Sequence, residues 1–130
     1  MTAWLVLISG CIEVLFGVSA MLAPALVVAG VGGTDLDGPA MALIRLLGVA
    51  TLAVGAGALL GRTWAARSPD PERAYGLGSY AAVSLAIYNI VAAPVLLLGA
   101  MATGSSGLWG GGALHGVIAL LFVYVLVARR

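Results

Sequence analysis

Four long apolar runs dominate the sequence, and each is close to the length that a helix needs to cross a lipid bilayer. They occupy residues 3–28, 40–61, 75–101 and 110–128. A spanning helix needs about 20 consecutive apolar residues, and inside lipid every backbone polar group must find its partner within the protein. The runs therefore predict an all-α protein, a four-helix transmembrane bundle with antiparallel up-down topology, forming a single integral membrane domain over residues 1–130.

The composition agrees with lipid as the solvent of this chain. Hydrophobic residues make up 62% of the sequence and charged residues only 8%, whereas a soluble domain carries about 25% charged residues. The formal net charge is +1 and there is no lysine. Because no basic stripe is present, nucleic acid is not expected as a partner.

The connections between the runs predict the orientation of the chain. Breaker-rich residues fill segments 32–39, 62–73 and 103–107, and such short connections favour antiparallel neighbouring helices. The second connection holds three arginines and the C-terminal tail two, while the first and third hold none. The positive-inside rule therefore predicts that both termini and the second connection are cytoplasmic.

The first run is expected to be a retained spanning helix and not a secretory signal. No Lys or Arg precedes it, and Glu13 would interrupt the apolar region of a signal. Cys11 is the only cysteine, and we expect it to be a small buried packing residue, as free cysteines usually are. The pair Asp35 and Asp37 is too short a signal for a calcium site.

Aromatic and small residues fall where a helical membrane protein needs them. Trp4, Trp64 and Trp109 lie at predicted helix ends, where indole rings settle between lipid tails and headgroups. Pro94 is expected to interrupt and kink the third helix. Small residues let helices approach closely in lipid, and the candidate helix-packing positions are Gly10, Gly17, Gly48, Gly55, Gly57 and Gly61.

Four polar side chains lie within the apolar runs: Glu13, Arg45, Asn89 and His115. Each shares its helix face with glycine or alanine, so all four are expected to point into the bundle. Glu13 and Asn89 should lie near mid-membrane, and Arg45 and His115 about 7–8 Å below the outer boundary at the helical rise. An arginine side chain can span that offset, so the sequence predicts a Glu13–Arg45 pair that Asn89 and His115 join.

Several roles for this intramembrane polar cluster stay open. It would fix the order of the helices as a structural clasp, or it would carry protons or hold a small ligand. Arg45 alone could instead extend to the outer headgroups. His115 could ligate haem or chlorophyll only with further ligands from a partner chain. No other metal site and no cofactor besides bound lipid is expected, and no catalytic arrangement is visible.

Two stretches of the sequence resemble known families. Residues 9–15, Ser-Gly-Cys-Ile-Glu-Val-Leu, resemble the first helix of the small multidrug resistance transporters. That likeness implies that Glu13 binds protons and cationic substrates in turn. The second resemblance, to small bacterial four-helix proteins that are loosely DoxX-like and of unknown function, extends over nearly the whole chain. It rests on Gly17 to Pro24, Arg45 to Gly48, Asn89, Trp109 and His115, and it implies a four-helix bundle in a bacterial inner membrane.

These features together predict a non-enzymatic accessory or structural subunit of a larger membrane complex, or a homo-oligomer. Small size, short connections and faces rich in Gly and Ala favour that interpretation. Its expected partners are the lipid bilayer and other membrane subunits or copies of itself. The alternative is a small proton-coupled transporter that uses Glu13, and the third hypothesis is a pigment- or haem-associated subunit.

Overall fold

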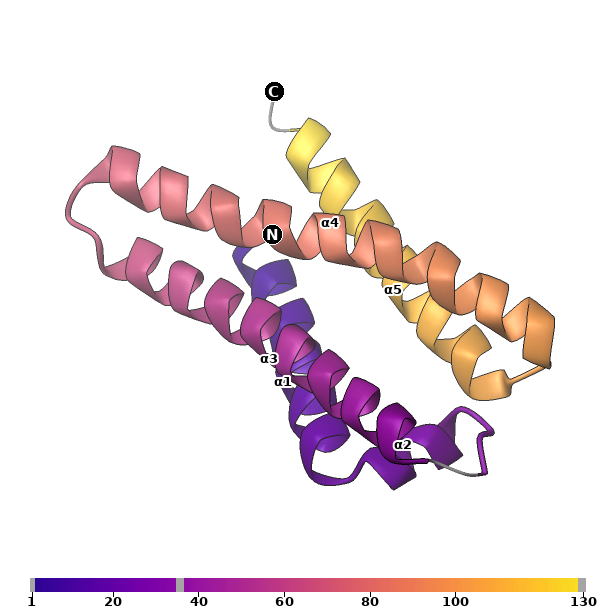
Figure 1. Cartoon of the computed structure of the whole chain (residues 1–130). Coiled ribbons are helices and arrows are strands. Elements are labelled where there is room, and N and C mark those ends of the chain that lie inside the picture. Colours follow the sequence, from indigo (N-terminus) through magenta and orange to yellow (C-terminus); the bar gives the residue numbers. More distant parts are fainter. Residues whose placement is uncertain (1, 35–36, 129–130) are drawn as a thin grey trace.

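The structure, a computed structural model, describes residues 2–34 and 37–128, and that part of the chain is almost entirely helical (Figure 1). Its helices are α1 (Thr2–Leu22), α2 (Pro24–Gly30), α3 (Gly38–Arg67), α4 (Pro71–Thr103) and α5 (Ser106–Val127). All except the short α2 are long and apolar enough to cross a membrane. The predicted all-α fold with four long apolar helices is confirmed.

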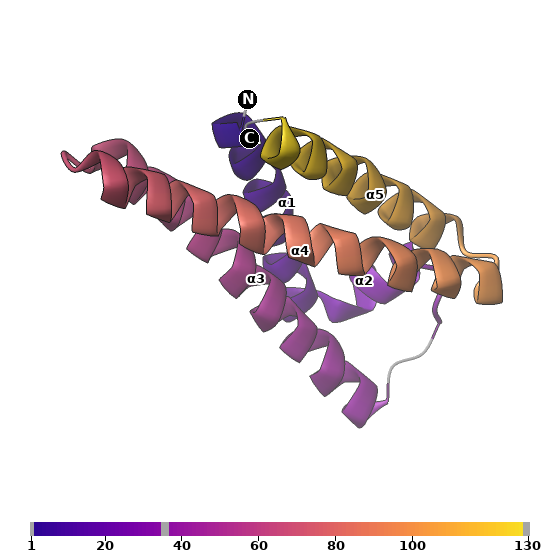
Figure 2. The ribbon, with the colours of Figure 1, turned by 90° about the horizontal axis from the view of Figure 1, so that it is seen from above.

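The four long helices run in alternating directions and pack in pairs. α1 crosses α3 in the most extensive contact of the molecule, and α4 packs along α5 in the next. Figures 1 and 2 show that α4 also forms a long hairpin with α3, so that α4 lies between α3 and α5. The result is an open bundle in which α3 and α5 are well separated.

The first predicted helix is divided in two. The sequence predicts one helix over residues 3–28, but α1 ends at Leu22 and α2 begins at Pro24. Proline has no backbone N–H and its ring clashes with the preceding turn, which kinks or breaks a helix, whereas its fixed φ suits the first turn of a new helix. Ala23 between them has φ −135° and ψ 56°, outside the helical region. Pro24 therefore marks the boundary between α1 and α2, which hydropathy alone does not reveal because both sides are apolar.

The other three long helices begin earlier than predicted, and α3 and α4 also end later. Side-chain caps fix their first residues: Asp37 accepts a 2.8 Å hydrogen bond from Ala40 N, Asp70 a 3.0 Å bond from Glu72 N, and Ser105 a 3.2 Å bond from Leu108 N. Asp and Ser are favoured in this position because their oxygens satisfy free N–H groups of the first turn. The predicted connection over residues 62–73 therefore shrinks to residues 68–70, and its arginines lie on helix ends.

The lengths of α3 and α4 exceed the thickness of a bilayer core. With 30 and 33 residues, they extend about 45 and 50 Å at the helical rise, against a hydrocarbon core of about 30 Å. Either the turn that joins α3 to α4 extends beyond the hydrocarbon core, or the two helices tilt relative to the bilayer normal. Pro94 lies inside α4, which continues through it to Thr103 without the predicted interruption.

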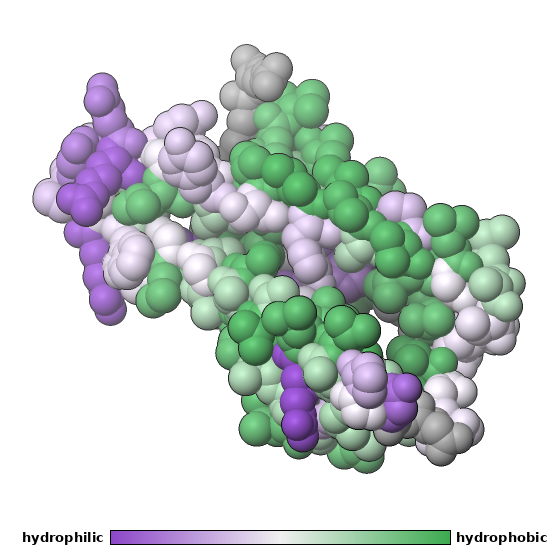
Figure 3. All heavy atoms as spheres, viewed as in Figure 1, coloured by the Kyte–Doolittle hydropathy of each residue, from purple (hydrophilic) through white to green (hydrophobic). Residues whose placement is uncertain are grey.

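Hydrophilic side chains gather at the two ends of the molecule. In Figure 3 they cover the α3–α4 turn on the left and a smaller region at the bottom, and hydrophobic side chains cover much of the surface between them. The α3–α4 turn lies at the same end as the start of α1, because Arg62 Nε donates a 2.9 Å hydrogen bond to the carbonyl oxygen of Ala3. We call this end, which carries Arg62, Arg67 and Arg73, the arginine end.

Glycine pairs bring α1 and α3 into backbone contact. A Cβ atom on Gly17 would lie 2.7 Å from the Gly48 carbonyl oxygen, and one on Gly55 would lie 2.7 Å from the Gly10 carbonyl oxygen. The two pairs are seven residues apart on both helices, so they lie on one face of each. Gly10, Gly17, Gly48 and Gly55 thus have the packing role that the sequence predicts.

Candidate intramembrane polar site

Three helices bring polar side chains together in the interior of the bundle. Glu13 and Ser9 come from α1, Asn89 from α4 and His115 from α5. Glu13 is 1% exposed, and Ser9 and Asn89 are fully buried. His115 is half-buried, with 13% of its side chain exposed. Three of the four polar residues singled out in the sequence, Glu13, Asn89 and His115, therefore meet.

Asn89 is the hub of this site. Its Nδ2 atom donates a 2.7 Å hydrogen bond to the carbonyl oxygen of Leu85 and a 3.1 Å bond to Ser9 Oγ. Its Oδ1 atom lies 2.7 Å from His115 Nδ1. A carbonyl oxygen can only accept, so the bond to Leu85 fixes which side of the amide carries the N–H groups. It follows that Asn89 Oδ1 accepts and that His115 Nδ1 carries a hydrogen and donates.

Glu13 lies beside this hydrogen-bonded network without completing it. Its Oε1 atom is 3.9 Å from His115 Nδ1, too far for a hydrogen bond, and it has no hydrogen-bond partner in the described part of the chain. A buried oxygen without a partner is costly, and it calls for an explanation wherever it occurs. Glu13 Oε1 is therefore the unsatisfied hydrogen-bond acceptor of this site.

Tyr88 completes the surroundings of Glu13. Its ring packs edge-on against the imidazole of His115, with ring centroids 5.6 Å apart and planes at 71°. Its side chain also interacts electrostatically with the Glu13 carboxyl group. Tyr124 on α5, by contrast, is exposed.

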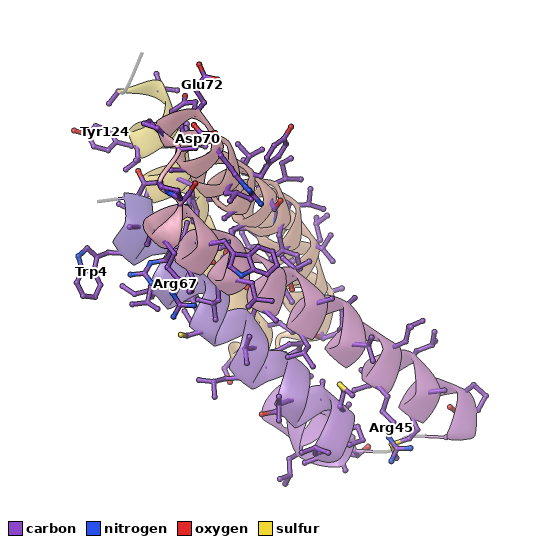
Figure 4. All side chains as sticks on the ribbon, turned by 90° about the vertical axis from the view of Figure 1, so that its left-hand side faces the viewer. Trp4, Arg45, Arg67, Asp70, Glu72 and Tyr124 are labelled. Atoms are coloured by element: carbon purple, nitrogen blue, oxygen red, sulfur yellow. The ribbon has the colours of Figure 1, made fainter. Side chains whose placement is uncertain are left out.

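Arg45 does not join the polar site, so the predicted Glu13–Arg45 pair is wrong. The side chain of Arg45 is exposed on α3 and forms no ion pair with any described residue. Figure 4 shows it at the opposite end of the molecule from Arg67, Asp70 and Glu72. Gly48 and Gly55 draw α3 against α1 on a face from which Arg45 is partly rotated away, which leaves Arg45 outside. Its position is the one expected of an arginine that extends to the headgroups, the alternative drawn for it from the sequence.

The position of His115 along its helix also differs from the prediction. Because α5 begins at Ser106 and not at residue 110, His115 lies nine residues, or about 13.5 Å, from its start. That is deeper than the predicted 7–8 Å and brings the imidazole level with Asn89. The cap at Ser105 gives α5 its extra turn, and that serine lies in the connection predicted over residues 103–107.

The participation of Ser9 and Tyr88 was missed. Ser9 lies four residues before Glu13 and so on the same helix face, where a polar side chain can meet the same neighbours. Tyr88 directly precedes Asn89, so nothing in the helical spacing of α4 assigns it to that face.

Several other sequence predictions can be placed. Gly61 lies against α4, with an added Cβ 3.4 Å from Ala81 Cβ, whereas an added Cβ on Gly57 meets nothing within 4 Å. The prediction of helix packing inside this chain thus holds for Gly61 and not for Gly57. Cys11 is exposed on α1, contrary to the expected burial. The interface aromatics Trp4, Trp64 and Trp109 are 66%, 55% and 47% exposed near helix ends.

Among the described residues, no group of three or more His, Cys, Asp or Glu side chains is placed to hold a metal ion. His115 Nδ1 is engaged with Asn89. Asp37 caps α3, and Asp35 lies outside the described residues. A role of His115 in binding haem or chlorophyll still depends on ligands from a partner chain.

No family model, curated protein or solved structure matches this chain. The two family resemblances noted in the sequence therefore stay expectations, and the function is argued from the geometry alone.

Proposed function

We propose that this chain is a non-enzymatic membrane protein that works by associating, through an exposed face of α3, with another membrane chain or with a second copy of itself. It would lie in a bacterial inner membrane with both termini on the cytoplasmic side. The orientation is supported by the arginine end, which the positive-inside rule assigns to the cytoplasm.

The observation that carries this proposal is the poor coverage of α3. Only 22% of the residues in its most apolar stretch are buried, the lowest share among the four long helices. Its uncovered surface includes a row of small residues at helical spacing, Ala50, Ala53 and Gly57. Small residues leave a groove that a neighbouring helix fills better than lipid. A face of this kind is therefore better suited to contact with another helix than to contact with lipid.

Replacing Gly57 by Leu tests this association. An added Cβ at Gly57 has no described atom within 4 Å, and Gly57 is exposed, so the four-helix fold should persist while the groove is filled. Gly110→Leu is the matched control, because Gly110 is also exposed and also open around its Cβ, but lies on α5. Co-purification in mild detergent should fall for Gly57→Leu and not for Gly110→Leu. Equal association by both variants and the wild type would contradict the proposal.

A second candidate function, proton-coupled transport through Glu13, is favoured by one specific observation. Glu13 Oε1 is buried without a hydrogen-bond partner, 3.9 Å from an imidazole nitrogen. Ionisable residues inside membranes commonly mark proton or substrate pathways. In liposomes, this function predicts proton-linked flux by the purified chain that is lost in Glu13→Gln and retained in Gly57→Leu. Absence of flux from the wild-type chain would exclude it.

A further inference from the structure

A cavity of about 860 Å³ opens at the arginine end, between the start of α1, the end of α3, the start of α4 and the end of α5. Its volume is within the range of known ligand sites. It lies outside the polar site described above, from which the apolar core around Leu85 and Phe122 separates it. Neither function proposed for this chain makes use of it.

Most of the cavity wall is apolar and made of small side chains. Ala65 and Ala66 line it from α3, Ala74 and Gly78 from α4, and buried Val6 and Ala82 form its inner part. Small residues on two adjacent helices leave room that no side chain of residues 2–34 and 37–128 fills. The wall would accept a flexible hydrocarbon chain and offers little to a polar solute.

The charge at this cavity is positive. The half-buried side chain of Arg62 lines it, and its Nε atom is held by the bond to the Ala3 carbonyl oxygen. That bond leaves the two terminal nitrogens of Arg62 without a partner among the described residues. No acidic side chain of the described chain lines the cavity. Thr2 Oγ1, at the same rim, is buried and also has no partner.

Two further arginines lie at the same end of the molecule without lining the cavity. Arg67 and Arg73 line a separate, smaller hollow at the α3–α4 turn, and Figure 3 shows the hydrophilic surface that gathers there. Basic pockets between transmembrane helices at the cytoplasmic side are suited to anionic lipid headgroups. Planar guanidinium groups bind phosphate through paired N–H donors.

We propose that this cavity binds one anionic phospholipid, with an acyl chain against the alanine and glycine wall and the phosphate on Arg62. The mostly apolar wall suits a hydrocarbon chain, and the guanidinium of Arg62, held by the Ala3 carbonyl oxygen, suits an anionic headgroup. An amphiphile with both parts is the molecule that the surrounding bilayer supplies at high concentration.

Native mass spectrometry after exposure to phosphatidylglycerol or phosphatidylcholine of equal chain length tests this site. Both lipids carry the phosphate, but the choline ammonium of phosphatidylcholine cancels its charge beside Arg62. The wild-type chain should therefore retain phosphatidylglycerol about tenfold better than phosphatidylcholine, the size of one charge-assisted contact. Arg62→Gln should remove that preference, and Arg62→Lys should keep most of it because the charge remains. Arg45→Gln, at the opposite end of α3, is the matched control and should retain the preference.

A second variant separates the cavity from the charge. Gly78 lines the cavity, and an added Cβ there lies 3.9 Å from Ala65 Cβ, an ordinary van der Waals contact, so Gly78→Leu is expected to place its side chain in the cavity. It should reduce retention of both lipids while the helical circular dichroism stays unchanged. Equal retention of the two lipids by the wild type, or full retention by Gly78→Leu, would overturn the proposal. Equal losses in Arg45→Gln and Arg62→Gln would overturn it too.

Discussion

Nδ1 of His115 donates a 2.7 Å hydrogen bond to Oδ1 of Asn89, and this bond joins α5 to α4 inside the apolar region of the molecule. Asn89 in turn reaches Ser9 on α1, so one amide connects three helices. The site that the sequence predicted around Glu13 is therefore organised around Asn89, with Glu13 at its side.

Replacing Asn89 by Leu should destabilise the protein. The change removes two interhelical bonds and leaves His115 Nδ1 and Ser9 without that partner. An interhelical hydrogen bond in a membrane contributes about 0.6–2 kcal/mol, so a loss of about 1–3 kcal/mol is expected. Ser84→Ala on the exposed face of the same helix is the control. Unfolding in mixed detergent micelles measures the stability of both variants. Equal stability of Asn89→Leu and Ser84→Ala would show that Asn89 does not hold the three helices together.

Arg45 should contribute little to the stability of the fold. Because its side chain is exposed and unpaired among the described residues, Arg45→Gln should change the free energy of unfolding by less than about 0.5 kcal/mol. For the same reason the effects of Arg45→Gln and Glu13→Gln should add within about 0.5 kcal/mol. A large coupling energy in this double-mutant cycle would instead show that Glu13 and Arg45 interact.

The crossing of α1 and α3 should be intolerant of a single methyl group. A Cβ on Gly48 would lie 2.8 Å from the Gly17 carbonyl oxygen, so Gly48→Ala must push the helices apart. Overpacking of this kind costs about 1–3 kcal/mol. Gly57→Ala on the same helix meets nothing and should be neutral or slightly stabilising. The free energy of unfolding of both variants checks this expectation. Equal values for Gly48→Ala and Gly57→Ala would contradict the close approach of α1 and α3 at Gly48.

The sequence predicts the helical class and the apolar helices well, because lipid permits few alternatives for apolar runs of this length. Helix ends were predicted less well. The caps at Asp37, Asp70 and Ser105 lie in segments that composition alone marks as connections, and Pro24 divides a run that is apolar on both sides.

The polar site was predicted in part for a different reason. Helical spacing places Glu13, Asn89 and His115 on faces with small residues, and those faces do meet. The same argument fails for Arg45, which shares its face with Gly48 and Gly55 only approximately. The two glycines take the contact with α1, and Arg45 is offset from them by about 60–80° around the helix axis, which is enough to leave its long side chain outside. Helical spacing in the sequence does not show whether a residue offset by that angle lies inside or outside a helix contact.

The orientation predicted from arginine counting can be tested with single cysteines in a Cys11→Ala background, since the native thiol is exposed. A membrane-impermeant maleimide added to intact cells should label cysteines at Thr34 and Ser106 and not one at Ser68, which lies in the α3–α4 turn at the arginine end. The positive-inside rule gives this expectation. Labelling at Ser68 alone would reverse the orientation.

The mass of the particle extracted from native membranes tests the central claim, that this chain acts through association. Extraction in a lipid-preserving polymer, followed by mass photometry or native mass spectrometry, compares that mass with the 13.0 kDa of one chain. The account predicts a discrete larger particle, either a multiple of this chain or a complex with another membrane protein, that shrinks in Gly57→Leu. A uniform particle containing one copy and no other protein would contradict it.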